Sequence, residues 1–487
     1  MVKEYRNFIN GSWKKSNSGK LFNDLNPATK RVIGMFQESD ENDINEAVDA
    51  AESSLKGWSN TPAPKRAEIL FEISRLLRKD KERLARIMTI EMGKVLKESR
   101  GDVQEAIDIF EFMAGEGRRL YGITTPSELK NKFCMTVRKP IGICALITPW
   151  NFPIAIPSWK LAPALIGGNT VVFKPSSDTP LCAIELIKVL DKAKVPKGVV
   201  NLVTGGGNLL GNSLIKHKKI RSVSFTGSRD TGDYIIRNAG IKKVGLELGG
   251  KNAIIVMDDA NLELAVDGIV WGAFGTTGQR CTAASRIIVH KKIKKKLELM
   301  LLKKIKRLKL GNGLDKKVDI GPLINERALE KVHHYTEIGK YEGAKLLCGG
   351  KKLEENGFYY QPTVFSNGNT NMKIAQEEIF GPVVVLIPVE DLNEAIEACN
   401  SVSYGLSSSI YTNNIENAFK AIEKIEAGIV YCNSSTIGAE VHLPFGGVKE
   451  TGNGTREGSS GIEEFTEIKT VYIDYSGKLQ KAQIDID

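Results

Sequence analysis

The 487-residue chain contains no long apolar run, and this absence limits where the protein can work. No segment approaches the ~18 consecutive apolar residues that a membrane-spanning helix needs. Residues 1–6 lack the apolar core of a secretory signal. Hydrophobic residues make up 41% of the chain and charged residues 26%, which is typical of a soluble globular protein. We therefore predict a cytoplasmic protein that does not bind membranes.

Cysteine and histidine are scarce and scattered. The seven cysteines show neither pairs nor C-x-x-C spacing, and of the five histidines only His333 and His334 are adjacent. This pattern argues against a disulfide framework and against a zinc site, so we predict no bound metal. We interpret the histidine pair as part of a solvated helix. Most cysteines are expected to be small buried apolar residues, but the surroundings of Cys281 set it apart.

Acidic residues are fewer than basic residues, so the formal net charge is +10. Such a charge can indicate a nucleic-acid or anionic partner. The densest basic run, residues 290–309, nevertheless carries apolar residues four apart, at Ile293, Leu297, Leu301 and Ile305. That spacing predicts a helix with one buried stripe and a lysine-covered solvent face, and we predict no nucleic-acid partner. The abundance of lysine and glutamate suggests a heat-adapted protein.

The length predicts two or three domains, because a single core stops growing well below 487 residues. From residue 140 the pattern alternates between strand and helix, with strands expected at 143–147, 170–173, 199–203 and 222–225. Buried strands that alternate with helices predict a parallel doubly wound sheet, which binds ligands at the carboxyl ends of its strands. A second α/β section begins near 250, with strand-like runs at 286–289, 383–389, 408–411 and 428–432.

The remaining segments lie outside this alternation. An Asn-Gly turn at residues 10–11 predicts a short hairpin near the N-terminus, and helical patterns follow to residue 117. Residues 123–139 are expected to be extended, as is the tail around 468–473. Pairing between these two segments would form a small sheet that protrudes as an arm.

Two residues could together make and hydrolyse a thioester. Cys281 sits in a glycine-containing loop, and Glu247 precedes the pair Gly249-Gly250. A thiolate nucleophile and a carboxylate base are the parts that this chemistry requires. Glu247 lies between two leucines, so partial desolvation should raise its pKa, as suits a base near neutral pH.

Four further motifs follow the same order as in a known family. They are Thr148-Pro149-Trp150-Asn151-Phe152-Pro153, Phe225-Thr226-Gly227-Ser228, Glu378-Ile379-Phe380-Gly381-Pro382 and Pro444-Phe445-Gly446-Gly447. With the Cys281 and Glu247 motifs, they show that the chain resembles the aldehyde dehydrogenase superfamily from end to end. The resemblance implies an α/β fold. It has a Rossmann-like cofactor domain (1–122 and 140–249), a catalytic domain (250–450) and a β oligomerisation arm (123–139 and 465–487). It also implies a homodimer or homotetramer.

The resemblance assigns four catalytic residues. Cys281 is the nucleophile, which a cationic neighbour such as Arg280, or a bound oxidised cofactor, would favour as thiolate. The Asn151 amide and the Cys281 backbone N–H form the oxyanion hole. Glu247 activates the water that hydrolyses the thioester, and Lys160 supports proton transfer. Because acylating relatives release the thioester to coenzyme A instead, Glu247 favours the hydrolytic branch.

The cofactor implied is NADP or NAD. Its contacts are expected from Ile147, Thr148, Pro149, Trp150, Lys174, Ser176, Ser177, Gly205, Gly207, Gly211, Phe225, Thr226, Gly227, Ser228, Leu248, Glu378 and Phe380. NAD-specific members usually carry an acidic residue three positions after the lysine, and this chain has Ser177 there. A serine does not repel a 2′-phosphate, so NADP is predicted to be preferred, with NAD possible.

The substrate wall implied by the family positions is Phe152, Trp159, Arg280, Thr282 and Phe445. It is mostly apolar, but Arg280 could pair with a distal carboxylate. Loop 438–445 looks most like that of 2,5-dioxopentanoate (α-ketoglutarate semialdehyde) dehydrogenases, which favours an ω-semialdehyde. Four alternatives remain open. They are broad specificity for aliphatic aldehydes or glyceraldehyde, a phosphorylated sugar, coenzyme A acylation and a catalytically silent protein on the same fold.

Overall fold

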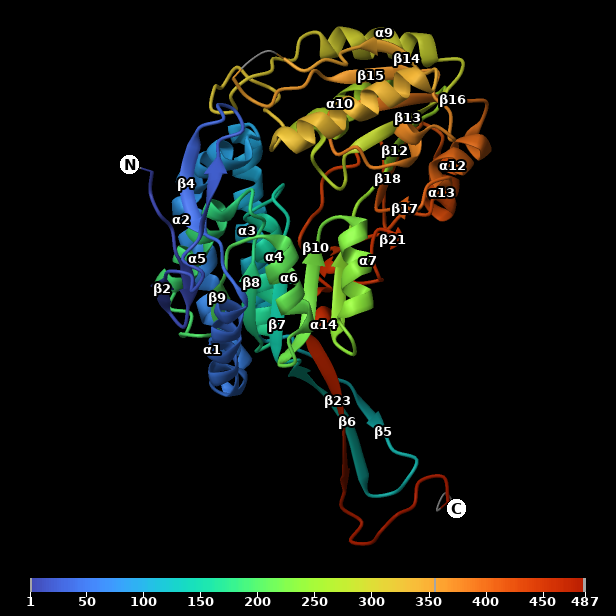
Figure 1. The fold of residues 1–487 in the computed structure, drawn as a ribbon. Helices are drawn as coiled ribbons and strands as arrows, with labels where there is room; N and C mark the ends of the chain where they lie inside the picture. The colour runs from blue at the N-terminus through green and yellow to red at the C-terminus, as the bar shows by residue number, and fades with distance from the viewer. Residues whose placement is uncertain (1, 354–355, 485–487) are drawn as a thin grey trace.

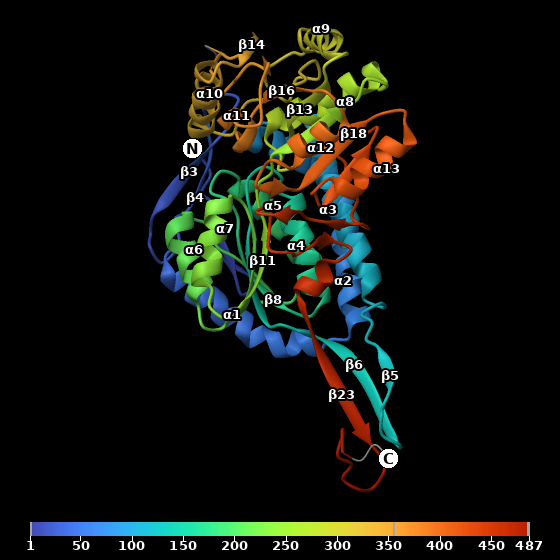
Figure 2. The same cartoon turned by 90° about the vertical axis from the view of Figure 1, so that its right-hand side faces the viewer.

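The computed structural model describes residues 2–353 and 356–484 and consists of two α/β lobes and a projecting arm (Figure 1). Each lobe is built on one seven-stranded sheet. In Figure 2 the arm extends from the lobe that contains the N-terminal half of the chain. Within the described residues, no helix combines the length and apolar character needed to cross a membrane.

The first sheet has the strand order β11-β10-β7-β8-β9-β1-β2. Its strands are β1 (Asn7–Ile9), β2 (Ser12–Lys14), β7 (Ile143–Ile147), β8 (Thr170–Lys174), β9 (Val200–Leu202), β10 (Ile220–Thr226) and β11 (Lys243–Glu247). Strands β7 to β11 are parallel, as predicted from the alternating pattern. The predicted N-terminal hairpin is also confirmed, and it extends the sheet antiparallel to β9.

Helices cover both faces of this sheet. They are α1 (Glu41–Asn60), α2 (Ala63–Met92), α3 (Leu96–Glu116), α4 (Ala155–Ile166), α5 (Pro180–Lys192), α6 (Gly207–Lys216) and α7 (Arg229–Asn238). Helices α2 to α5 share one apolar core with Leu146 and Phe173, while α1, α6 and α7 share another with Ala145 and Val172. Neighbouring strand residues thus point to opposite cores, which is the doubly wound arrangement. A small hairpin, β3 (Leu21–Leu25) and β4 (Val32–Gln37), precedes α1.

The second sheet has the order β14-β15-β16-β13-β12-β18-β19. Its strands are β12 (Asn252–Val256), β13 (Ala284–His290), β14 (Lys345–Cys348), β15 (Thr363–Ser366), β16 (Val383–Val389), β18 (Ser407–Tyr411) and β19 (Ile429–Cys432). Only β14 runs antiparallel to its neighbour in this sheet as described. Its helical elements are α8 (Leu262–Phe274), η1 (Gly275–Gly278), α9 (Lys294–Ile305), α10 (Glu326–Tyr341), α11 (Lys373–Gln376), α12 (Leu392–Asn400) and α13 (Ile415–Lys424).

Helices α9 and α10 contain the basic run and the adjacent histidines for which the sequence analysis made predictions. In α9, Leu297, Leu301 and Ile305 are buried, so the amphipathic reading of this basic run is confirmed. On α10, His334 is exposed, but His333 is half-buried and its Nδ1 lies 3.2 Å from the Tyr360 hydroxyl. The prediction that both histidines are solvated is therefore wrong for His333, because its side of the helix packs on Tyr360.

The arm consists of β5 (Thr124–Pro126), β6 (Lys132–Pro140) and β23 (Thr466–Asp474). Strand β23 pairs antiparallel with β6 along its whole length, from Thr466 opposite Pro140 to Asp474 opposite Lys132. The predicted pairing of the tail with the 123–139 segment is confirmed. Between β19 and the arm lie three short strands and one helix, β20 (Pro444–Phe445), β21 (Val448–Lys449), β22 (Glu457–Gly458) and α14 (Gly461–Glu464). Strand β20 pairs with β22, and β21 pairs with β17 (Tyr404–Gly405), which directly precedes β18.

Candidate active site

A strained turn holds Cys281 between the lobes. Thr276 and Thr277 have φ values of 50° and 59°, and Gly278 follows at 70°. The left-handed region is unfavourable for a β-branched residue, so the surroundings must enforce it. A Cβ on Gly278 would lie 2.3 Å from the Gly381 carbonyl oxygen, so only glycine fits there. The buried carboxylate of Glu98 accepts a hydrogen bond from the Thr276 N–H at 3.0 Å and fastens the turn to α3.

Cys281 lies where two cavities meet. One cavity, of about 550 Å³, opens along α3 and α4, and the other, of about 490 Å³, runs toward α7 and α10. The side chains of Ile156, Thr226 and Leu248 also line both. A ligand in the first cavity and a ligand in the second can therefore contact the same sulfur atom.

The Asn151 side chain faces the second cavity and is only 3% exposed. Its Nδ2 donates to the Gln279 carbonyl oxygen at 3.1 Å, which fixes the amide and leaves its second N–H available. A fixed donor beside the sulfur suits an oxygen atom on which negative charge develops.

Glu247 ends β11 and lines the first cavity with Cys281. Its side chain is buried, and its Oε1 has no hydrogen-bond partner among the described residues. Burial raises the pKa of Glu247 well above its usual value, the nearby Glu457 raises it further, and Lys160 opposes both. Gly446 makes room for this carboxylate, since a Cβ there would lie 2.6 Å from Oε1. The predicted direction of the pKa shift is confirmed, and its main cause is desolvation.

Lys160 lies behind Glu247 in a buried polar cluster. Its Nζ donates to Glu457 Oε1 at 2.7 Å and to Ser224 Oγ at 2.9 Å. Burial alone would lower the pKa of Lys160, but the carboxylates of Glu457 and Glu464 raise it above its ordinary value. Sequence reasoning missed Glu457, because it lies 297 residues from Lys160 and belongs to no motif used above.

The thiol of Cys281 is protonated in this environment. Burial raises its pKa to about 12, and the carboxylates of Glu247, Glu378 and Glu457 act in the same direction. We predicted that Arg280 would favour the thiolate, and the structure gives no support for this role. The Arg280 guanidinium instead donates from Nε to Thr276 Oγ1 at 2.9 Å and lies 3.9 Å from Glu98. Both of these contacts are to the turn before Cys281 and to α3, and neither is to the sulfur.

The second cavity contains part of the predicted cofactor set. Predicted residues on its wall are Pro149, Trp150, Thr226, Gly227, Ser228, Leu248, Glu378 and Phe380. Glu378 Oε1 accepts a hydrogen bond from the Gly250 N–H at 2.9 Å, and Trp150 contacts Phe380 edge-on. Arg327 and Lys331 of α10 also line this cavity and were missed, since one basic helix surface resembles another in sequence. These two cations provide charge that a phosphate would need.

Other predicted cofactor residues lie outside this cavity, near the ends of β7, β8 and β9. Ile147 pairs with Lys174 across β7 and β8, and the Thr148 N–H donates to the Lys174 carbonyl. Ser177 Oγ donates to the Gly205 carbonyl at 3.0 Å. The remaining members of this set are Ser176 beside Ser177, Gly207 and Gly211 in α6 and the buried Phe225 of β10. The structure thus places two groups of predicted contacts along one edge of the sheet.

Glu38 directly follows β4 and lies near Lys174 and Gly206. It was not predicted as a cofactor contact. Its Oε1 accepts a hydrogen bond from the Gly206 N–H at 2.7 Å. Burial lowers the pKa of Lys174 to about 8, and Glu38 acts against this shift. A carboxylate is therefore present near Lys174 although Ser177 is not acidic.

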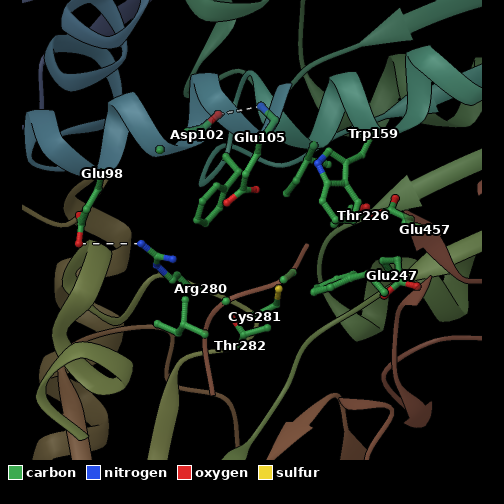
Figure 3. A pocket seen from close by; sticks show the side chains of 18 of the residues that line it. Glu98, Asp102, Glu105, Trp159, Thr226, Glu247, Arg280, Cys281, Thr282 and Glu457 are labelled. Atoms are coloured by element: carbon green, nitrogen blue, oxygen red, sulfur yellow. Dashed lines mark hydrogen bonds and ion pairs between the residues drawn. The ribbon is translucent and has the colours of Figure 1, made fainter. Parts of the chain in front are cut away.

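All five residues predicted for the substrate wall line the first cavity (Figure 3). Trp159 and Phe445 meet edge-on, with ring centroids 5.6 Å apart. The Arg280 guanidinium lies between the rings of Phe152 and Trp271, at 5.1 and 5.0 Å from their centroids. Helix α3 adds Glu98, Asp102 and Glu105 to this wall, and sequence reasoning missed all three. Within the described ranges no group of three or more His, Cys, Asp or Glu side chains could hold a metal ion.

Comparison with known proteins decides the family. The model of the aldehyde dehydrogenase family matches residues 13–471. The chain belongs to the aldehyde dehydrogenase family. An α-ketoglutaric semialdehyde dehydrogenase of Bacillus subtilis is 42% identical over 477 residues, 96% of this chain and 98% of that protein. An α-ketoglutarate semialdehyde dehydrogenase of Haloferax volcanii is 43% identical over 484 residues, 98% of this chain and all of that protein.

A solved structure extends the likeness to the fold. Betaine aldehyde dehydrogenase from Staphylococcus aureus in complex with NAD+ superposes with a TM-score of 0.95 at 36% identity, covering 98% of this chain and 96% of that one. The predicted α/β fold with parallel sheets is therefore confirmed as the aldehyde dehydrogenase fold. The protein is an NAD(P)-dependent oxidoreductase that acts on aldehydes.

Proposed function

We propose that this aldehyde dehydrogenase converts an ω-semialdehyde to the carboxylic acid by covalent catalysis at Cys281 and hydrolysis assisted by Glu247. The observation that carries this proposal is the position of Cys281 at the junction of the two cavities, with Glu247 on the wall of the first cavity and Asn151 on the wall of the second. A silent protein on the same fold would have no need for these groups, two of them buried, to meet.

The second cavity fits a nicotinamide cofactor. It combines the aromatic pair Trp150 and Phe380, the carboxylate of Glu378, two cations on α10 and the N-terminal end of α7 at Ser228. Trp150, Phe380 and Glu378 would hold the nicotinamide ribose end, and Ser228 would bind phosphate, as helix N-termini do. When bound there, the nicotinamide supplies the acceptor for the hydride that leaves the substrate carbon.

The chain's own groups divide the remaining work. The Cys281 thiol gives its proton to ionised Glu247, which passes it on to solvent, as the sulfur attacks the aldehyde carbon. The free N–H of Asn151 and the Cys281 backbone N–H donate to the resulting alkoxide. After oxidation to the thioester, ionised Glu247 takes a proton from water, which attacks the thioester carbon and releases the acid. Lys160 and Glu457 form a hydrogen-bonded polar cluster behind Glu247. This cluster can compensate for the change in the charge of Glu247 when that residue takes up the proton.

Arg280 supports a carboxylated substrate. Its Nε donates to Thr276 and its Nη2 lies 3.9 Å from Glu98, but its Nη1 has no partner among the described residues. The rings of Phe152 and Trp271 lie 5.1 and 5.0 Å from the guanidinium carbon. A guanidinium positioned in this way binds a carboxylate well. The two semialdehyde dehydrogenases at 42% and 43% identity support the same class, and 2,5-dioxopentanoate is our specific proposal. Broad activity on aliphatic aldehydes is the second candidate, favoured by the apolar walls of Trp159 and Phe445.

We further propose that NADP is used at least as well as NAD. Support comes from Ser177, which places no carboxylate beside Lys174. The carboxylate of Glu38 near Lys174 would repel a 2′-phosphate, whereas Ser177 would not. The ratio of kcat/KM for NADP to kcat/KM for NAD measures the combined effect of these two residues. The protruding arm supports a homodimer or homotetramer, and we keep the cytoplasm as the proposed location.

The test is a panel of five-carbon aldehydes with NADP and with NAD, in the presence and absence of coenzyme A. We expect a higher kcat/KM for 5-oxopentanoate than for pentanal, and no requirement for coenzyme A. Arg280→Ala should remove the preference for the carboxylated substrate, whereas Arg100→Ala, a surface change that breaks an exposed pair with Glu82, should leave it intact. Equal losses on both aldehydes in Arg280→Ala would refute the carboxylate role.

A further inference from the structure

Helix α3 presents three acidic side chains to the substrate cavity. Glu98, Asp102 and Glu105 are spaced four and three residues apart, so they share one face of the helix. All three line the cavity that contains Cys281 (Figure 3). Carboxylates on the wall of a largely apolar cavity are costly unless they are paired or hydrogen-bonded.

Two of the three are paired. Glu98 accepts the Thr276 N–H and lies 3.9 Å from Arg280. Asp102 forms an ion pair with the buried Lys94 at 2.9 Å and accepts the Ala155 N–H at 2.7 Å. Glu98 is therefore paired with Arg280, and Asp102 with Lys94.

Glu105 is the exception. The described residues offer it no hydrogen bond and no ion pair, and Figure 3 shows its carboxyl group directed into the cavity between Asp102 and Arg280. Its pKa is raised to about 7, chiefly by burial; Asp102 and Asp108 act in the same direction, and Arg280 and Lys94 act against it. Glu105 is thus substantially protonated near neutral pH and is then a hydrogen-bond donor without an acceptor.

We propose that Glu105 in its acid form is a specificity-determining residue that donates a hydrogen bond to an oxygen at carbon 2 of an ω-aldehyde acid whose carboxylate is bound by Arg280. This inference rests on the proposed function and assigns a residue to the 2-oxo group of the proposed substrate. Glu105, Arg280 and Cys281 all line one cavity, which a single substrate molecule can occupy. When Glu105 ionises, its side chain no longer has an O–H to donate, and its negative charge repels the oxygen at carbon 2 of the substrate.

The experiment compares 2,5-dioxopentanoate with 5-oxopentanoate, which differ only in the 2-oxo group. Because both carry the carboxylate and use the same chemistry, the ratio of their kcat/KM values cancels the titration of Cys281 and Glu247. We expect this ratio to fall roughly tenfold from pH 6 to pH 8.5, as the neutral donor is lost.

Three variants separate the possible outcomes. Glu105→Gln keeps an N–H donor that does not titrate, so the ratio should stay high at every pH, whereas Glu105→Leu should bring it near unity throughout. Glu111→Gln is the matched control on the same helix, away from the cavity. An unchanged ratio in Glu105→Leu, or a parental ratio that rises with pH, would overturn the inference. Absence of a 5-oxopentanoate preference over pentanal would instead refute the proposed substrate class.

Discussion

At the scale of single residues, the site depends on groups whose charge is set by burial. Burial is the largest cause that raises the pKa of both Glu247 and Cys281. In the mechanism that we propose, each group acts in its ionised form, and the charges of Lys160 and Glu457, which are hydrogen-bonded to each other, act on the pKa of Glu247 in opposite directions. Desolvation therefore acts on the proposed nucleophile and on the proposed base in the same direction, although the two residues lie far apart in the sequence.

The first prediction concerns Glu247. Glu247→Gln should lower kcat by about 10²–10⁴-fold, because the amide cannot take the proton from water. In the parent enzyme, the raised pKa means that Glu247 is ionised only above its folded pKa, so kcat should rise with pH well beyond the usual carboxylate range.

The measurement is kcat against pH for parent and variant, with Glu263→Gln on the exposed start of α8 as the control. A variant with parental kcat, or a parental profile already flat from pH 5 upward, would contradict the assignment of Glu247 as base.

The second prediction concerns cofactor choice. Ser177→Glu adds a carboxylate next to Lys174 and should lower kcat/KM for NADP by about tenfold or more relative to NAD, because like charges repel. Glu38→Gln removes a carboxylate near Lys174 and should raise kcat/KM for NADP relative to NAD. The kcat/KM values of both variants are measured by steady-state kinetics with the two cofactors. If neither substitution alters the ratio, the 2′-phosphate does not bind near Lys174.

At the scale of elements, the turn before Cys281 stores strain that the rest of the site must hold. Three successive residues in the left-handed region, two of them threonines, are kept there by α3 and by the segment around Gly381. Such a turn aims the cysteine without allowing it to move, which suits a nucleophile that must meet two ligands.

The third prediction tests this turn. Gly278→Ala should destabilise the protein by more than ~1 kcal/mol, because φ is positive and the new methyl would meet the Gly381 carbonyl. Gly57→Ala in α1 is the control; its Cβ meets nothing within 4 Å, and the change should stabilise by ~0.5–1 kcal/mol. Denaturant unfolding and kcat measure both variants. Equal stability of Gly278→Ala and the parent would show that the turn is not strained.

At the scale of the whole molecule, the arm is a sheet with exposed apolar side chains. Ile468 and Tyr472 of β23 are 65% and 66% exposed. Strand β23 ends the order of the arm sheet, and β19 ends that of the second seven-stranded sheet. Edge strands with exposed apolar residues readily pair with another chain.

The fourth prediction follows from this surface. Ile468→Glu combined with Tyr472→Glu should shift the protein from an oligomer to a 53.5 kDa monomer, measured by light scattering after size-exclusion chromatography. Tyr341→Glu, at an exposed position on α10 remote from the arm in sequence, should leave the mass unchanged. An oligomer that survives the double substitution would show that another surface holds it together. Heat adaptation stays a prediction from composition, to be measured as Tm.

The sequence by itself determined the family, the parallel sheets, the arm and the residues that ended up around Cys281, because local periodicity and short motifs encode backbone conformation and chemistry together. Only the tertiary structure decided that Arg280 lies near Glu98 and that Glu457 contacts Lys160. It also decided that Glu38 lies near the proposed cofactor contacts and that Glu105 lines the proposed substrate cavity. These partners come from distant elements and carry no local pattern. Charge pairing and burial depend on which groups the folded chain brings together.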